Sequence, residues 1–298
     1  MNNKLMARLH PRNRYQGHYD FAKLTSLVPE LSSWLRNRPY GGVTLDFSEP
    51  EAVRLLNQAL LYDYYQLHWQ LAPGSLCPPV PGRADYIHHL ADLLACDNHG
   101  IQPSAVHVLD IGCGANCIYP LIGHAEYGWR FTGSEINKLS IQSALSIIAA
   151  NPGLQKNIRL RRQRHTDKVF TGIIQPNEHY HLTLCNPPFH TSAEAAKRGS
   201  DRKMRHLKLD SGLGLNFAGM PHELYCEGGE KAFIIRMIKE SEQFKHQVDW
   251  FSCLVSSASN LPAIKHQLNC MSVSQVQVVK MGQGNKISRF IAWRYLKK

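Results

Sequence analysis

The sequence contains eight cysteines but no C-x-x-C pair, the spacing on which many cysteine-based metal and redox sites depend. It also lacks an apolar N-terminal run that would serve as a cleavable signal or a membrane span, so the thiols are expected to be reduced in the cytoplasm. No internal repeat or low-complexity tract is present. With 298 residues the chain can bury a large core without metal or disulfides, which favours one α/β domain with an extension.

Acidic residues are missing from the first nineteen positions, as in a transit peptide, but His10-Pro11 would interrupt the amphipathic helix of such a peptide. Over the whole chain, 34 Lys and Arg stand against 23 Asp and Glu, which gives a formal net charge of +11 and a pI near 9.3. The basic residues are clustered, first at Arg159, Arg161, Arg162 and Arg164 and again between residues 197 and 208. Clustered positive charge favours a polyanionic partner, and nucleic acid is the leading class.

A stretch rich in proline and glycine, which interrupt helices and strands, divides the chain into two regions. Residues 1–75 mix basic and aromatic side chains and are expected to form a small helical module. Residues 72–82 contain four prolines and two glycines and are interpreted as a connector, after which apolar spacing predicts a helix over 86–96. The predicted domains are therefore 1–75 and 76–298.

From residue 105 onward, strand and helix patterns alternate, which is typical of a parallel sheet covered by helices. The predicted strands are 106–110, 129–133, 157–161, 181–185 and 250–255. The predicted helices are 138–150, 230–244 and 261–268. Two further strands, 273–280 and 288–295, are joined by a stretch rich in turn formers, so a hairpin is expected to close one edge of the sheet.

The first predicted strand of the sheet runs directly into Asp110-Ile111-Gly112-Cys113-Gly114-Ala115-Asn116. Glycines allow a tight turn and a close approach to a ligand, so Asp110, Gly112, Gly114 and Asn116 are candidate cofactor contacts. Glu135 ends the next strand, 21 residues beyond Gly114, where an acid can accept hydrogen bonds from both ribose hydroxyls of a nucleoside.

Two nucleoside cofactors compete for this glycine loop, nicotinamide dinucleotide and S-adenosylmethionine. A dinucleotide site usually has a third glycine, but Cys117 occupies that position. Asp110 suits the ammonium of a methionine moiety better than a pyrophosphate, which favours S-adenosylmethionine. A tight strand-to-helix turn without a ligand is the remaining interpretation.

Residues 186–189 read Asn-Pro-Pro-Phe and follow the fourth predicted strand of the sheet. Ligands of open α/β sheets bind beyond the carboxyl ends of the strands, so this turn is expected beside the cofactor. The Asn186 amide oxygen and the Pro187 carbonyl can accept both protons of an exocyclic amine, while Phe189 can stack on the flipped-out ring. A plain turn after a strand is the alternative.

The chain resembles the ribosomal RNA large subunit methyltransferase F family over nearly its whole length. The resemblance rests on Pro11 to Tyr15, Val80 to His88, Asp110 to Pro120, Asn186 to Phe189, Glu227 to Glu230, and Gly282 to Trp293. It implies a Rossmann-like class I methyltransferase fold with a seven-stranded, mostly parallel sheet and a C-terminal antiparallel hairpin. It also implies S-adenosylmethionine as donor and N6 of one adenine in 23S ribosomal RNA as acceptor, with Arg83, Gly112, Glu135 and Asn186 lining the cofactor or the amine.

Several basic residues are candidate RNA contacts. Arg162 and Arg164 follow a strand that neighbours the predicted site, and phosphate contact is favoured over a merely solvated loop. Residues 192–210 are basic and poor in apolar side chains, and their candidates are Lys197, Arg198, Arg202 and Lys203. Arg12 and Arg14 beside Tyr15 could form a third contact.

Other functions remain open at this point. The same chemistry could serve DNA adenine or a protein glutamine, and a non-catalytic RNA-binding assembly protein could keep the fold. Cys113 and Cys117 lack a second pair to complete a zinc site, so no metal is expected. The predicted partners are 23S ribosomal RNA or a large-subunit assembly intermediate, and the protein is expected to be a monomer.

Overall fold

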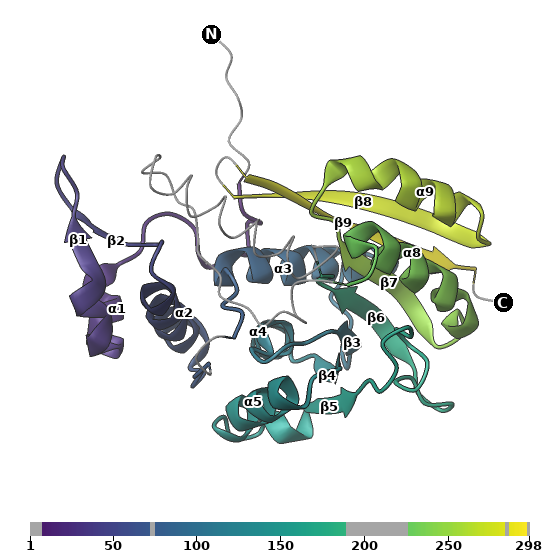
Figure 1. The fold of residues 1–298 in the computed structure, drawn as a ribbon, viewed down its shortest axis with the longest axis horizontal. Helices are drawn as coiled ribbons and strands as arrows, with labels where there is room; N and C mark the ends of the chain where they lie inside the picture. The colour runs from purple at the N-terminus through teal and green to yellow at the C-terminus, as the bar shows by residue number, and fades with distance from the viewer. Residues whose placement is uncertain (1–7, 72–74, 189–225, 284–285, 297–298) are drawn as a thin grey trace, which may run out of the picture.

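The structure is a computed structural model that describes residues 8–71, 75–188, 226–283 and 286–296 (Figure 1). A seven-stranded sheet in the order β5-β4-β3-β6-β7-β9-β8 forms its centre. Its strands are β3 (His107–Ile111), β4 (Arg130–Glu135), β5 (Ile158–Arg162), β6 (Tyr180–Cys185), β7 (Val248–Leu254), β8 (Val273–Gln283) and β9 (Lys286–Tyr295). The pairs among β3 to β7 are parallel, whereas β9 pairs antiparallel with β7 and β8. The predicted fold class and the C-terminal hairpin are thus confirmed.

Helices cover both faces of the sheet. One hydrophobic cluster joins strand residues such as Val108 and Leu182 to α3 (Val80–Asp97), α4 (Ile118–Tyr127) and α5 (Lys138–Ala149). The other cluster joins Leu109 and Phe251 to α8 (Gly229–Ser241) and α9 (Leu261–Asn269). Neighbouring residues along a strand point to opposite faces, so a strand buried on both faces is apolar without interruption. That continuity made these strands predictable.

The N-terminal region was predicted to be helical, but it contains a short β-hairpin in addition to helices. It contains α1 (Phe21–Leu27), a 3-10 helix (Pro29–Trp34), α2 (Pro50–Tyr65), and a two-stranded hairpin of β1 (Leu35–Asn37) and β2 (Val43–Leu45). Strands of three residues are too short to show an alternating pattern, which is why the sequence did not reveal them. Leu24 and Leu56 from this region belong to the same hydrophobic cluster as α3. Residues 72–74 lie outside the described residues, so the boundary at residue 75 stays a prediction.

The connector predicted over 72–82 ends earlier than expected. Helix α3 already begins at Val80, with Pro81 in its first turn. Proline fits there because the first N–H groups of a helix have no partner within the helix. The early start places Arg83 in the first turn of α3, within the helix and not in a loop.

Candidate active site

The glycine loop and the Asn186 turn lie at the same edge of the sheet. Strands β3 and β6 are parallel neighbours with Ile111 opposite Cys185, so Gly112 and Asn186 follow at the same level. Neighbouring strands are about 4.8 Å apart. The chain order also reverses here, because β4 and β5 lie on one side of β3 and β6 and β7 on the other. Such a switch point is where open α/β sheets bind ligands.

The glycine loop depends on left-handed backbone conformations at Gly112 (φ 71°) and Gly114 (φ 65°). The Gly112 and Cys113 amides both donate to the Ser134 carbonyl, at 2.9 and 3.0 Å, which fixes the loop against β4. Cys113 is buried, and its Sγ lies 3.0 Å from where a side chain on Gly133 would begin. Cys113 is therefore a packing residue.

Glu135 holds the loop in a way that the sequence did not reveal. Its carboxylate accepts hydrogen bonds from the Gly114 amide (3.0 Å) and from the Ile136 and Asn137 amides (2.8 and 2.9 Å). A carboxylate offers about four acceptor positions, so roughly one remains for a ribose hydroxyl. Glu135 is thus a scaffold for the loop and a candidate ligand of the cofactor.

Asp110 is fully buried, and neither carboxylate oxygen has a hydrogen-bond partner among the described residues. Burial raises its pKa well above the ordinary value of 3.8, the nearby Glu135 raises it further, and Arg83 opposes both. A buried carboxylate without partners is costly to fold. Its environment fits a cationic ligand such as the ammonium of a methionine moiety.

Arg83 supplies the complementary charge next to Asp110. It donates a 2.6 Å hydrogen bond to the Tyr119 hydroxyl, and its guanidinium carbon lies 5.5 Å from the centre of the Tyr119 ring. Its Nε is buried without a partner among the described residues. The unfilled capacity of Arg83 and Asp110 together fits the carboxylate and the ammonium of one amino-acid moiety.

Asn186 has the same kind of unfilled capacity. Its Oδ1 is buried and has no hydrogen-bond partner among the described residues. Pro187, which follows, is also buried and has no N–H of its own. The turn therefore presents acceptors and no backbone donor from the prolines, as required to bind an amine. Phe189 lies outside the described residues.

Asn116, also a predicted cofactor contact, forms hydrogen bonds within the protein, and its contact with the cofactor stays a prediction. Its Oδ1 accepts from the Ile118 amide at 3.1 Å, and its Nδ2 donates to the Leu76 carbonyl at 3.3 Å. Its own carbonyl accepts from the Trp69 indole at 2.9 Å. The side chain therefore ties the glycine loop to the start of α4 and to the segment before α3.

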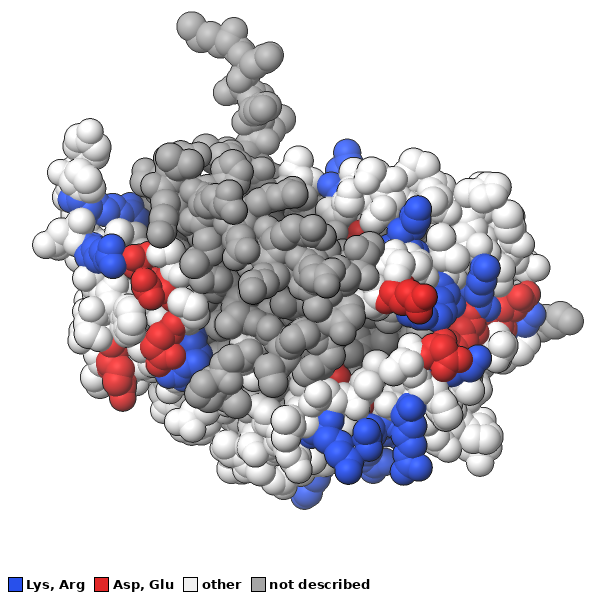
Figure 2. Space-filling model, viewed as in Figure 1, with Lys and Arg blue, Asp and Glu red and all other residues white. Residues whose placement is uncertain are grey.

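Two predicted RNA contacts lie beside the site. Arg162 is the register partner of Glu135 across β4 and β5, and Arg162 and Arg164 are both exposed. Figure 2 shows Lys and Arg gathered at the lower margin of the molecule, where Figure 1 places β5. Four other candidates, Lys197, Arg198, Arg202 and Lys203, lie outside the described residues.

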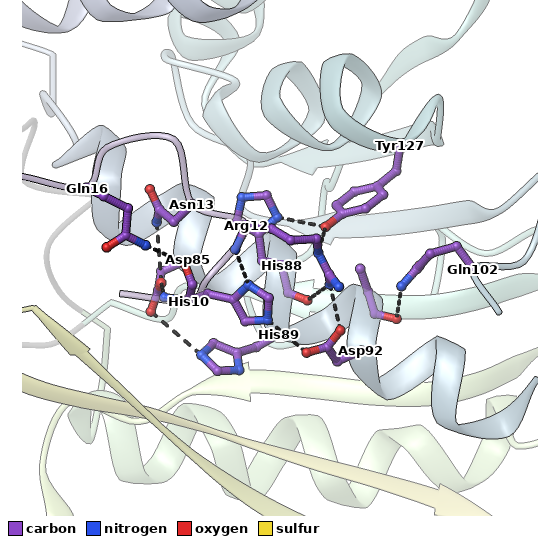
Figure 3. A network of polar contacts seen from close by, with 11 residues as sticks. His10, Arg12, Asn13, Gln16, Asp85, His88, His89, Asp92, Gln102 and Tyr127 are labelled. Atoms are coloured by element: carbon purple, nitrogen blue, oxygen red, sulfur yellow. Dashed lines mark hydrogen bonds and ion pairs between the residues drawn. The ribbon is translucent and has the colours of Figure 1, made fainter. Parts of the chain in front are cut away.

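Arg12 and Arg14, also predicted RNA contacts, form hydrogen bonds within the protein, and Figure 3 shows those of Arg12. Arg12 donates to Asp92 on α3 (2.6 Å) and to the Tyr127 hydroxyl on α4 (2.9 Å). Arg14 donates to both carboxylate oxygens of Glu126, at 2.9 and 3.3 Å. The structure accounts for both side chains without RNA, and their contact with RNA stays a prediction.

The same N-terminal segment reaches the start of α3. The His10 amide donates to Asp85 at 2.6 Å (Figure 3), and the Asn13 side chain donates to the Pro81 carbonyl at 2.9 Å. We call residues 10–14 with these partners on α3 and α4 the N-terminal clasp. Because Pro81 and Asp85 flank Arg83 in sequence, the clasp fixes the helical turn from which Arg83 extends.

Two clusters of His and Asp resemble metal sites, one of His10, His89 and Asp92 and the other of His179, His181 and Asp249. The His10 Nδ1 accepts from the Arg12 amide at 3.1 Å, which leaves the ring proton on Nε2, pointing to Asp92. The His181 Nδ1 likewise accepts from the His107 amide at 3.1 Å. A metal would have to displace these hydrogen bonds, so the geometry disfavours both clusters. The absence of a metal stays a prediction.

A cavity of about 1260 Å³ opens beside the glycine loop and was not predicted. Ala115 and Asn137 line it next to the loop, and the described side chains around it include no Lys, Arg, Asp or Glu. Further lining residues come from α1, α2, residues 67–71 and α5. Because these segments are far apart in sequence, no local pattern could have indicated the cavity.

No helix among the described residues has the length and hydropathy that crossing a bilayer would require.

A family model described as RNA methyltransferase matches residues 3–297. Two similar proteins are both named ribosomal RNA large subunit methyltransferase F. The protein from Pectobacterium carotovorum subsp. carotovorum (strain PC1) is 55% identical over 97% of this chain and 93% of its own length. The one from Cronobacter sakazakii (strain ATCC BAA-894) is 55% identical over 97% of this chain and 94% of its own length.

Solved structures of human METTL16 share the fold. Its catalytic domain in complex with MAT2A 3′UTR hairpin 1 has a TM-score of 0.85 and 30% identity, over 97% of this chain and 96% of that one. Its N-terminal domain in complex with SAH has a TM-score of 0.78 and 28% identity, over 97% of this chain and 99% of that one.

Proposed function

This chain belongs to the RNA methyltransferase family that includes ribosomal RNA large subunit methyltransferase F, and we propose that it methylates N6 of an adenine in 23S ribosomal RNA. Family membership makes it an S-adenosylmethionine-dependent RNA methyltransferase. The observation that supports the adenine amine is the buried Asn186 Oδ1 beside the glycine loop, which has no hydrogen-bond partner among the described residues. The basic surface supports RNA over a protein acceptor. We further propose that the enzyme acts as a monomer in the cytoplasm, where bacterial ribosomes are assembled.

The cofactor side of the site combines opposite charges in a buried place. S-adenosylmethionine supplies an electrophilic methyl group on a sulfonium. The Asp110 carboxylate would accept hydrogen bonds from the ammonium of its methionine moiety, and Arg83 would donate to the carboxylate. Glu135 would accept from a ribose hydroxyl with the acceptor position that its backbone contacts leave. These contacts hold and orient the cofactor, and orientation supplies a large part of the acceleration.

The acceptor side of the site needs no ionised base before methyl transfer, because the N–C bond forms as the S–C bond breaks and the methylated nitrogen, then cationic and acidic, loses one proton afterwards. The lone pair of an adenine amine is delocalised into the ring and is a poor nucleophile. Asn186 Oδ1 and the Pro187 carbonyl would each accept one amine proton, which favours the pyramidal geometry that localises the lone pair. Placed in a water-excluded corner, the two acceptors act mainly on the transition state. Stacking by Phe189 remains part of the proposal.

The test is the variant Asn186→Ala, assayed with labelled S-adenosylmethionine and 23S ribosomal RNA from cells that lack the gene. Its kcat is expected to fall roughly 100-fold or more, the typical loss of one preorganised hydrogen-bonding group. Cofactor affinity, measured by calorimetry, should stay close to wild type. Nuclease digestion and nucleoside mass spectrometry should show N6-methyladenosine in the wild-type product. Full activity of Asn186→Ala, or a label on another nucleoside, would rule the mechanism out.

A further inference from the structure

A row of basic residues continues from the site onto the outer face of α8, and all of them are exposed except Arg236, which is half-buried. We call this set the basic strip, and its members are Arg162, Arg164, Lys168, Lys231, Arg236 and Lys239. The last four of these line a second hollow of about 570 Å³ between α8 and the loop after β5. Figure 2 shows Lys and Arg along the lower and right margins of the molecule, which correspond to β5 and α8 in Figure 1.

Glu240 joins the two parts of the basic strip into one surface. Its buried carboxylate accepts hydrogen bonds from the amides of Val169 (2.7 Å), Phe170 (3.1 Å) and Thr171 (2.7 Å). These bonds fasten the loop after β5 to α8. Lys168, directly before this anchor, is thereby held beside the cations of α8.

Asp and Glu lie among the Lys and Arg at the right margin of the molecule in Figure 2, so the charge of the basic strip is partly offset there. Asp167 is the only acid within ion-pair distance of any member among the described residues, 3.6 Å from the Lys168 ammonium. The negative charge of Glu240 is taken up by three backbone amides. Arg236 stacks on the Phe233 ring at 5.7 Å, and its Nε is buried without a partner among the described residues. Cations that repel one another without bound anions favour a polyanion as ligand.

Both ends of the basic strip lie near the carboxyl ends of the strands, where the site is. Arg162 pairs in register with Glu135, as described above. Lys231 lies in the first turn of α8, where the neighbouring Glu230 accepts a 2.6 Å hydrogen bond from the Ser256 amide just beyond β7. A strand of RNA whose base enters the site could thus place its flanking phosphates on the strip.

We propose that the basic strip binds the phosphodiester backbone of the RNA that flanks the target adenine. The inference rests on the proposed function and adds the path of the substrate. Lys231 and Lys239 are eight positions apart on one helix face, which is about 12 Å along the axis. They therefore contact different phosphates, and each contributes its own counterion release.

The test compares Lys231→Ala/Lys239→Ala with the matched control Lys265→Ala/Lys280→Ala. Lys265 on α9 and Lys280 on β8 are also exposed, but β8 is the edge strand opposite β5. Affinity for 23S ribosomal RNA prepared without protein from cells lacking the gene is measured at several salt concentrations. The first variant should bind more weakly and lose about 1.5 from the slope of log K against log salt. The control should keep the wild-type slope, and both variants should keep the wild-type melting temperature and cofactor affinity.

The outcomes separate this inference from the proposed function. A wild-type protein that transfers no methyl group to 23S ribosomal RNA would overturn the proposed function whatever the strip does. If the wild type is active but the two double variants have equal salt slopes, the inference that the basic strip binds RNA is wrong and the proposed function stands. For an active enzyme, KM for RNA should rise in Lys231→Ala/Lys239→Ala while kcat at saturating RNA stays unchanged. A fall in kcat with unchanged KM would also contradict backbone binding.

Discussion

Asp110→Asn is expected to stabilise the protein without cofactor and to weaken cofactor binding. The wild-type carboxylate is fully buried, lacks hydrogen-bond partners among the described residues, and lies near a second acid, Glu135. Asparagine has nearly the same shape and removes the charge. The expected gain is about 1–3 kcal/mol in the free energy of unfolding. In domains of 150–250 residues, about 1 kcal/mol shifts the melting temperature by roughly 2–4 °C.

The dependence of this gain on pH follows from the raised pKa of Asp110. The folded protein retains a proton that the unfolded chain releases, so the favourable contribution of protonated Asp110 is complete below its ordinary pKa of 3.8 and is lost as pH rises. The melting temperatures of wild type and Asp110→Asn should therefore be close in acid and diverge toward neutral pH. A constant difference at all pH values would contradict the assignment.

The expected loss of cofactor affinity arises because the variant lacks the charge that would pair with the cationic moiety of the cofactor. Removing one partner of a buried charge pair costs about 2–5 kcal/mol, or roughly 30- to 5000-fold in Kd. Binding of a cationic moiety should lower the raised pKa of Asp110, so at a pH where the free protein keeps this proton, calorimetry in buffers of different ionisation enthalpy should detect proton release for wild type and none for the variant. Cofactor binding by Asp110→Asn at wild-type affinity would refute the role given to this carboxylate.

Three further predictions concern stability. Arg161 lowers the pKa of Glu178 to about 2, so Glu178→Gln should lose about 1–2 kcal/mol of stability at neutral pH. This deficit should shrink as pH falls from the ordinary value of 4.5 to about 2, and an equal deficit in acid would contradict the prediction. Arg12→Ala should lower the melting temperature because it removes hydrogen bonds to α3 and α4. The control Arg162→Ala should weaken RNA binding and leave the melting temperature unchanged. Gly133→Ala should cost about 1–3 kcal/mol because its Cβ would lie 2.8 Å from a β5 side chain, and a wild-type melting temperature would disprove that contact.

The parts of the fold that sequence predicted are those whose cause is local. Buried strands are recognisable because both of their faces are apolar, and glycines at positions 112 and 114 mark a turn that needs left-handed backbone. The hairpin of β1 and β2 is too short to show a pattern. Its existence depends on tertiary pairing that no local window contains.

The site divides in the same way. The positions of Asp110, Glu135 and Asn186 were predictable because each lies at or next to the end of a recognisable strand, and the carboxyl ends of parallel strands meet on one side of the sheet. The structural roles of Asn116 and Arg12 were not, because their partners lie 40 and 80 positions away in sequence. A polar residue near a site gives no local sign of whether its hydrogen bonds go to a ligand or to the protein.

The N-terminal clasp sets an order of events during synthesis. Its hydrogen bonds join His10 to Asp85, 75 positions later, and Arg14 to Glu126, 112 positions later. Contacts between such distant segments form only after both have left the ribosome. Closing the long loop between them costs entropy, which is offset only when the contacts have formed. The first segment to emerge must therefore wait for α3 and α4. The turn that presents Arg83 is completed late, so under the role proposed for Arg83 a nascent chain would gain full affinity for the methyl donor only when the clasp has closed.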